Sequence, residues 1–194
     1  MNTLLRSTAA LVVATVASDC HLITGMDNGA KPITTTAAAQ SLFSLLKSSG
    51  AAVDRQVAST FNGTTSVSGS AGTASVSGQK SNTRTSSSSS TTTTTQSDLQ
   101  ISFAGYRSSA LTVTGKMRWF DYYYGRTACS SSACASSSSH SEAVSGTSIH
   151  VEFSYNGESY ADTITIDADS PGDVSSWSVK ITTQAGQVFT FTAY

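Results

Sequence analysis

Residues 149–166 read IHVEFSYNGESYADTITI, the most informative stretch for the fold. Apolar residues alternate with polar ones in its first half, at the period of a β-strand: Ile149, Val151, Phe153 and Tyr155. The dipeptide Asn156-Gly157 then supplies a two-residue hairpin turn. With this turn Phe153 faces Tyr160, and the apolar side chains of both halves fall on one face. The stretch therefore predicts an antiparallel hairpin with one buried face.

The same register places Ile149 opposite Ile164 and Asp162 opposite Val151 on the apolar face. A carboxylate buried there alone would be costly. We therefore expect Asp162 to lie at the open end of the sheet or to have a partner.

The alternation recurs in both directions along the chain. Four further groups of alternating apolar residues mark strands: Leu99, Ile101 and Phe103; Leu111, Val113, Met117 and Trp119; Trp177, Val179 and Ile181; and Phe189, Phe191 and Ala193. The connections between them are too short for crossover helices, so neighbouring strands should be antiparallel. Residues 57–194 are therefore predicted to form a β-meander.

One helix is expected, over residues 34–49, which read TTTAAAQSLFSLLKSS. Leu42, Leu45 and Leu46 follow helical spacing, the threonines offer N-cap residues, and Gly50 is expected to end the helix just after Lys47 in its last turn. The predicted fold class is α+β and mainly β. It is a single domain, 34–194, with the helix packed on a curved antiparallel β-meander that is an open sheet or a partial barrel.

Two low-complexity segments rich in serine and threonine interrupt the meander, near 84–96 and 130–141. Threonine favours extended backbone, so Thr91–Thr95 should lead into the strand at Leu99. The serine run before it and Ser136–Ser139 are expected to form hairpin tips.

The amino terminus has the outline of a secretory signal over residues 1–19, followed by a tether over 20–33. Arg6 precedes an apolar run, Ala9–Ala17, that is about half of the ~20 residues needed to span a bilayer. The segment Val16-Ala17-Ser18-Asp19-Cys20 resembles the lipobox of bacterial envelope lipoproteins. The resemblance implies lipidation of Cys20, a membrane partner through that anchor, and an outer-membrane or cell-surface location.

Asp19 departs from this pattern, which has a small uncharged residue before the cysteine. Cleavage after Ala17 or Ser18 by an ordinary signal peptidase is the alternative, and it gives a periplasmic or secreted protein.

The chain has three cysteines, an odd number for an exported protein. Cys129 and Cys134 lie close together in a serine tract and are predicted to form a disulfide that pins a loop tip. Lipidation would account for Cys20. A zinc site of these two cysteines with His140 matches the oxidising compartment less well.

Composition excludes some classes of function. The net charge is -1 and only 12% of residues are charged, so no basic excess exists to hold nucleic acid. Serine and threonine make up a third of the chain, with 38 and 28 residues. No G-x-S-x-G motif occurs, and His150 with Glu152 is expected on a solvated strand face. The sequence therefore predicts no enzyme and no cofactor.

Two further candidate sites remain. Both faces of the strand at 117–124 carry aromatic residues, so either a second layer covers its outer face or the rings form an exposed binding platform, with Arg118 stacked on them. The candidate ligand-facing residues are Trp119, Phe120, Tyr122, Tyr124, Phe153 and Phe189. Asp167, Asp169 and Asp173 form a calcium candidate in a presumed loop, although this loop lacks the EF-hand pattern.

These observations predict a non-enzymatic exported protein of the cell envelope or surface, lipid-anchored, with a structural or interaction role. The alternative is a carrier or binding module that holds a hydrophobic or carbohydrate ligand in the concave face of the sheet.

Overall fold

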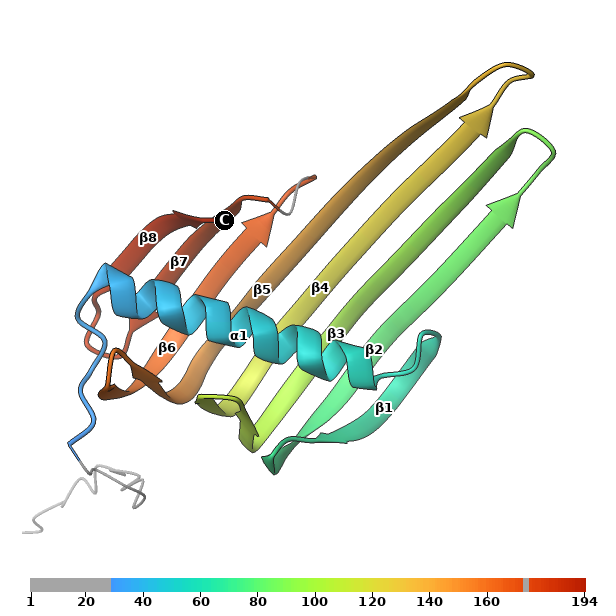
Figure 1. Cartoon of the computed structure of the whole chain (residues 1–194). Helices are drawn as coiled ribbons and strands as arrows, with labels where there is room; N and C mark the ends of the chain where they lie inside the picture. The colour runs from blue at the N-terminus through green and yellow to red at the C-terminus, as the bar shows by residue number, and fades with distance from the viewer. Residues whose placement is uncertain (1–28, 173–174) are drawn as a thin grey trace, which may run out of the picture.

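The computed structural model describes residues 29–172 and 175–194. It has one helix and one open antiparallel sheet whose eight strands follow chain order, as the sequence predicts (Figure 1). The elements are α1 (Thr36–Gln56), β1 (Phe61–Ser68), β2 (Ala71–Ser86), β3 (Ser90–Ser108), β4 (Leu111–Cys129), β5 (Cys134–Tyr155), β6 (Glu158–Ser170), β7 (Trp177–Thr183) and β8 (Val188–Ala193). Within these described residues, no helix is long and apolar enough to cross a membrane.

Helix α1 is longer than the sequence indicated. Its N-cap is Thr35, whose hydroxyl accepts a hydrogen bond from the Ala38 amide at 3.2 Å, as expected of the threonine run. The helix continues seven residues beyond Ser49, so Lys47 lies in its interior and Arg55 in its last turn. Gly50 does not end it, because the glycine is used for packing: a Cβ there would lie 2.9 Å from Cζ3 of Trp119.

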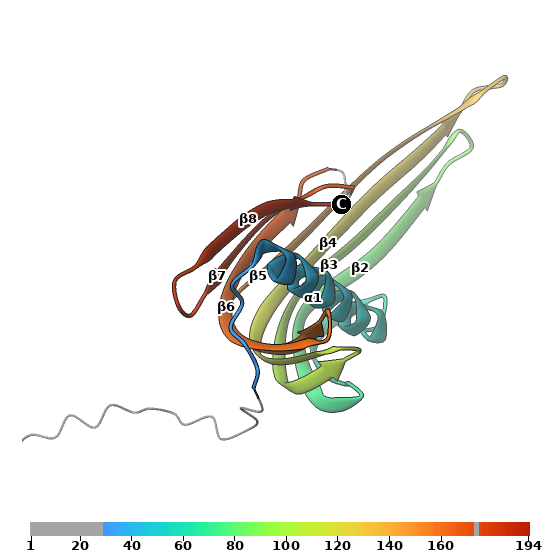
Figure 2. The same cartoon turned by 60° about the vertical axis from the view of Figure 1, so that its left-hand side comes forward.

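The helix lies across the concave face of the sheet (Figures 1 and 2). Leu42 and Leu46 are fully buried, as are Leu99 and Trp119 on the sheet beneath. Phe43 meets Trp177 edge to face, with ring centroids 5.3 Å apart. One continuous hydrophobic core therefore joins the helix to β1–β8.

The sheet curves because bulges interrupt neighbouring strands. The register shifts between Ala71 and Thr73, Phe103 and Tyr106, Thr114 and Arg118, and Gly146 and Ile149. A bulge bends its strand and increases the local twist. Gly72 and Gly105 adopt left-handed backbone there, and a Cβ on Gly72 would collide with the carbonyl of Gly105. Figure 2 shows the strand ends curling toward the helix beyond these points.

The β5–β6 hairpin has the register that the sequence predicts, with Tyr155 opposite Glu158 and Ile149 opposite Ile164. Asp162 has partners, as expected. Its carboxylate accepts hydrogen bonds from the amides of Ile33 at 3.1 Å, Thr163 at 2.8 Å and Gln184 at 3.3 Å. It thereby ties three segments of the chain together.

The end of the predicted tether belongs to the folded unit. Lys31 forms a parallel bridge to Tyr160, and its Nζ lies 2.6 Å from Glu158. Ile33 is fully buried in the core. Tether residues 20–28 and the predicted signal, 1–19, lie outside the described residues.

Candidate functional site: a β arm with two exposed faces

The longest strands extend past the helix as two adjoining hairpins, which we call the arm: residues 81–96 of β2–β3 and 122–141 of β4–β5 (Figure 1). The arm contains none of the buried residues of the core. Of its 36 residues, 22 are serine or threonine. It is a ribbon held by the backbone ladder of its two hairpins, without buried side chains beneath it.

The sequence predicted the first hairpin tip well and the second less well. Thr91–Thr95 lie in β3, as expected, and the serine run forms the turn before it. Ser136–Ser139 do not form a tip: they belong to β5, and the turn is at 130–133. The disulfide between Cys129 and Cys134 closes this turn, with four residues between the two cysteines.

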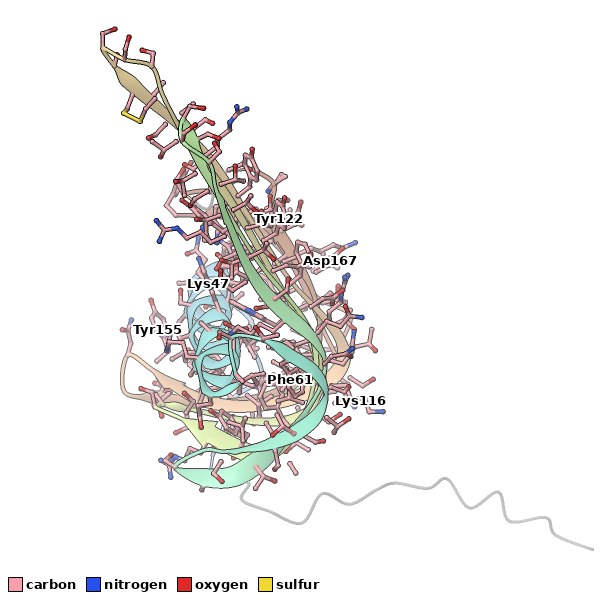
Figure 3. All side chains as sticks on the ribbon, turned by 90° about the vertical axis from the view of Figure 1, so that its right-hand side faces the viewer. Lys47, Phe61, Lys116, Tyr122, Tyr155 and Asp167 are labelled. Carbon is pink, nitrogen blue, oxygen red and sulfur yellow. A yellow bond between two sulfur atoms is a disulfide. The ribbon has the colours of Figure 1, made fainter. Side chains whose placement is uncertain are left out.

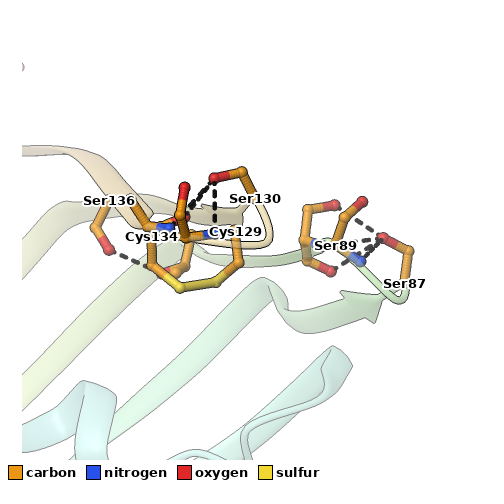
Figure 4. The surroundings of a disulfide bond; sticks show 10 residues. Ser87, Ser89, Cys129, Ser130, Cys134 and Ser136 are labelled. Carbon is orange, nitrogen blue, oxygen red and sulfur yellow. Dashed lines mark hydrogen bonds between the residues drawn. A yellow bond between two sulfur atoms is a disulfide. The ribbon is translucent and has the colours of Figure 1, made fainter.

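The predicted disulfide closes the tip of the β4–β5 hairpin (Figure 4). The Cα atoms of Cys129 and Cys134 are 4.0 Å apart. The Ser130 hydroxyl accepts a hydrogen bond from the Ala133 amide at 3.2 Å, and that of Ser87 accepts one from the Ser90 amide at 3.1 Å in the other tip. The Cys129 amide donates to the carbonyl of Ser89 at 2.7 Å, which joins the two hairpins near their ends.

Both long edges of the arm lack a neighbouring strand within the described residues. On one side, β1 pairs with β2 only as far as Lys80. On the other, β6 pairs with β5 only from Glu142 onward. The β5 edge, 134–141, contains no Lys, Arg, Glu, Asp or Pro, the residues with which proteins commonly block edge pairing.

An aromatic row lies on the outer face of β4, the face away from the helix, and runs from Phe120 into the arm. Side chains alternate along β4, so Trp119 points to the core, and Phe120, Tyr122 and Tyr124 point outward in line. All three are half-exposed, and no second layer covers them in the part of the chain that the structure describes. Of the two alternatives drawn from the sequence, the covering layer is therefore absent among the described residues. Lys116 and Asp167 mark the same outer side in Figure 3, opposite Lys47.

A charged pair borders this row. Arg118 lies over the ring of Phe120, with Cζ 5.6 Å from the centroid. Its Nε and Nη2 donate to the two oxygens of Asp98 at 2.8 and 2.9 Å. These hydrogen bonds hold the pKa of the Asp98 carboxyl below its ordinary range and raise the pKa of Arg118. The pair lines a shallow depression of about 360 Å³ with Gln79, Gln96 and Gln100.

The other candidate ligand-facing residues lie elsewhere. Trp119 and Phe153 are buried in the hydrophobic core. Phe153 stacks on Tyr160 with centroids 5.1 Å apart. Phe189 is half-buried in β8 and packs against the core. These three residues do not join the outer row, because they lie in or against the hydrophobic core.

The inner face carries a polar cluster where the arm meets the helix: Asp121, His140, Glu142 and Lys47. Asp121 lies directly opposite Glu142, and His140 is opposite Tyr123. His140 Nε2 is 2.8 Å from Asp121 Oδ1, and Lys47 Nζ is 3.4 Å from Glu142 Oε2. Lys47 also lies over the ring of Trp177, at 4.4 Å.

This cluster was not among the predicted sites, although the cysteine pair contains a signal for it. The disulfide fixes Cys129 opposite Cys134, and counting back along both strands in steps of one brings Asp121 opposite Glu142. This count requires Ser136–Ser139 to be strand, whereas the serine run on its own favours a hairpin tip.

His150 and Glu152 lie on a strand face, with His150 Nε2 3.3 Å from Glu152 Oε1. Thr163 Oγ1 is 3.5 Å from His150 Nδ1, a long contact. Asp162, on the neighbouring strand, is engaged by the backbone amides described above. This group is therefore a poorly aligned surface network.

The carboxylates of the calcium candidate do not lie in one loop. Asp167 and Asp169 are exposed on β6 instead of in a loop, because β6 continues to Ser170. Asp173 lies outside the described residues, as does the lipidation candidate Cys20.

Comparison with protein-family models, with curated proteins and with solved structures found no match for this chain.

Proposed function

We propose that the protein is a non-enzymatic exported component of the cell envelope, anchored by a lipid on Cys20, that presents the arm to partners. The observation that carries this proposal is the arm itself. It extends beyond the core, adds no buried residue to it, and offers an uncharged strand edge and an uncovered aromatic row. A ribbon of this kind adds little to the stability of the domain. We therefore infer that its role is to contact another surface.

The anchor and the arm fit together physically. In an anchored protein the arm would be held near the envelope, where hydroxyl-rich faces stay soluble and a disulfide persists. The low charge of the chain suits a partner recognised by hydrogen bonds and ring contacts better than one recognised by charge.

The mature amino terminus tests the anchor. The intact mass and amino-terminal peptide of protein from its native host should show an acylated Cys20. A free terminus at Ser18 or Asp19 would replace the anchored form by a secreted one. An intact Met1 would refute export.

A second candidate function is binding of a glycan along the outer row. Phe120, Tyr122 and Tyr124 are flat rings at every second position, bordered by the hydroxyls of Thr94 and Ser139 and by Gln96. Such rims and faces suit the polar edges and apolar faces of sugar rings. This position differs from the concave face, where the helix leaves no room.

Cosedimentation with purified peptidoglycan sacculi tests the second candidate. The double variant Tyr122→Ala/Tyr124→Ala should lose binding. Tyr123→Ala is the matched control, because Tyr123 comes from the same strand but points to the inner face. Equal binding by both variants would exclude the outer row.

A further inference from the structure

We propose that Asp121, His140 and Glu142 form a binding site for a divalent transition-metal ion of the zinc class. This site lies on the inner face at the base of the arm, on the opposite face from the outer row, and its His140 stands at the base of the β5 edge. The proposal concerns binding alone and does not depend on the proposed function.

The side chains of Asp121, His140 and Glu142 converge. One ligand atom from each of the three side chains can be chosen so that all lie within 4.8 Å of one another. The ligands stand on two paired strands, with Asp121 directly opposite Glu142 and His140 two residues along β5. A hydrogen-bonded ladder fixes these positions, so the site needs only side-chain rotation to close around an ion.

The site brings two carboxylates, Asp121 and Glu142, close together. Carboxylates directly opposite each other on one face of a sheet repel and destabilise the pair. Here Asp121 and Glu142 are placed in this way, with side chains 28% and 12% exposed. A cation between them relieves the repulsion. Lys47 reaches from the helix to Glu142, and the imidazole of His140 lies 2.8 Å from Asp121, but among the described residues no single cation bridges the two carboxylates.

The ligand types select the ion. One imidazole with two carboxylates suits zinc and its neighbours, which accept nitrogen and oxygen donors in a four-coordinate site. Calcium takes six to eight oxygen ligands, which these three side chains do not supply. Three protein ligands leave one position for water.

Lys47 then acts as a competitor. Its ammonium occupies the approach to Glu142, and its side chain, one third exposed, is long enough to withdraw. Removal of this positive charge should strengthen metal binding. A purely structural role for the cluster predicts no such change.

Calorimetric titration of the purified full chain with zinc chloride tests the proposal. All proteins carry Cys20→Ser and His21→Ala, because these residues are themselves metal-ligand types. The parent should bind one zinc ion. His140→Ala and Glu142→Gln should each weaken binding by roughly tenfold or more. Lys47→Met, which keeps the apolar stem over Trp177, should strengthen it.

His150→Ala is the matched control, because His150 also has a glutamate beside it, at 3.3 Å, but belongs to no three-ligand cluster among the described residues. It should leave zinc binding unchanged. Zinc binding that survives His140→Ala, or is lost in His150→Ala, would overturn the site. Displacement of zinc by an equal concentration of calcium would overturn the selection.

A measurement on the parent protein removes the dependence on variant folding. Zinc should move the imidazole nitrogen resonances of His140 in a ¹⁵N-labelled sample and leave those of His150 in place. Equal movement of both would refute a defined site.

Discussion

Gly50 shows how one missing methyl group sets the distance between the helix and the sheet. It is buried in the middle of α1, where Cε3 and Cζ3 of the Trp119 ring occupy the space that a Cβ would take. Glycine is unfavourable in a helix interior by roughly 1 kcal/mol relative to alanine. The packing of Trp119 against the helix therefore outweighs the low helix propensity of glycine at this position.

We predict that Gly50→Ala destabilises the protein despite the better helix former. Overpacking a filled core costs typically 1–3 kcal/mol, which outweighs the gain in propensity. Urea unfolding measures the change. Ser48→Ala, an exposed position of the same helix, should leave the free energy of unfolding equal or slightly higher. A Gly50→Ala protein as stable as the parent would mean that Trp119 can move aside.

The ion pair of Arg118 and Asp98 predicts a pH effect. The guanidinium holds the pKa of Asp98 below its ordinary range, mainly through hydrogen bonds. A carboxyl group whose pKa is lower in the folded state contributes stability above its unfolded pKa, near pH 4. That contribution is lost as the pH falls through the lower, folded value.

Arg118→Gln should therefore raise the pKa of Asp98 and remove this acid dependence. Carboxyl carbon shifts followed by NMR from pH 2 to 7 would report it. Arg126→Gln, also on the outer face of β4, should leave the titration of Asp98 unchanged. The energetic effect should be small, because both side chains are more than a third exposed.

The disulfide stabilises the tip of the β4–β5 hairpin more than the whole domain. It closes a short loop, for which the chain-entropy model gives about 2 kcal/mol. The arm contains no core residue, so its tip can open while the body stays folded. Cys129→Ser/Cys134→Ser should speed amide hydrogen exchange around 125–138 and leave the main unfolding transition in place.

The β2–β3 tip provides an internal comparison. It has the same serine hydrogen-bonded turn but no disulfide, and its exchange should not change apart from the residues near Ser89, which accepts from Cys129. Loss of the main transition together with the tip would show that the arm and the body unfold as one unit.

Local periodicity predicted the elements because each hairpin carries its own signal. The turn at Asn156-Gly157 and the apolar alternation fix the β5–β6 register without any distant contact. Periodicity could not predict where α1 ends, because Gly50 matches both a helix end and a close contact. The contact depends on Trp119, which is 69 residues away in sequence.

The candidate sites show the same division. The aromatic row was visible in the sequence as a run of rings on one strand. Whether it was covered depended on the number of layers, which no local pattern reports. Asp121 and Glu142 meet only because two strands of the arm remain paired through polar sequence with weak β signals.

The whole molecule divides into a body with a core and an arm without one. Among the described residues, every buried hydrophobic side chain lies in the body, in α1 and the segments next to it and in β1–β7. Truncating a core residue such as Leu46 to alanine should cost about 2–5 kcal/mol. Removing the arm removes exposed polar ribbon, so the body should keep most of its stability.

We predict that an armless variant folds. Residues 83–94 and 124–139 are each replaced by Asn-Gly, which joins the opposite pairs Asn82–Thr95 and Tyr123–His140 by the turn that suits two-residue hairpins. Its free energy of unfolding should stay within about 1–2 kcal/mol of the parent, because no core residue is lost.

The armless variant also tests the proposed role of the arm in the native host. There it should reach the envelope and carry the same amino terminus as the parent. It should lose the contacts that the arm makes, which chemical crosslinking in intact cells measures. Leu46→Ala is the comparison: destabilised, but with the crosslinks retained in the fraction that folds. An armless protein that keeps every crosslink would move the interaction to the body, and one that fails to fold would show that the arm stabilises the sheet it extends.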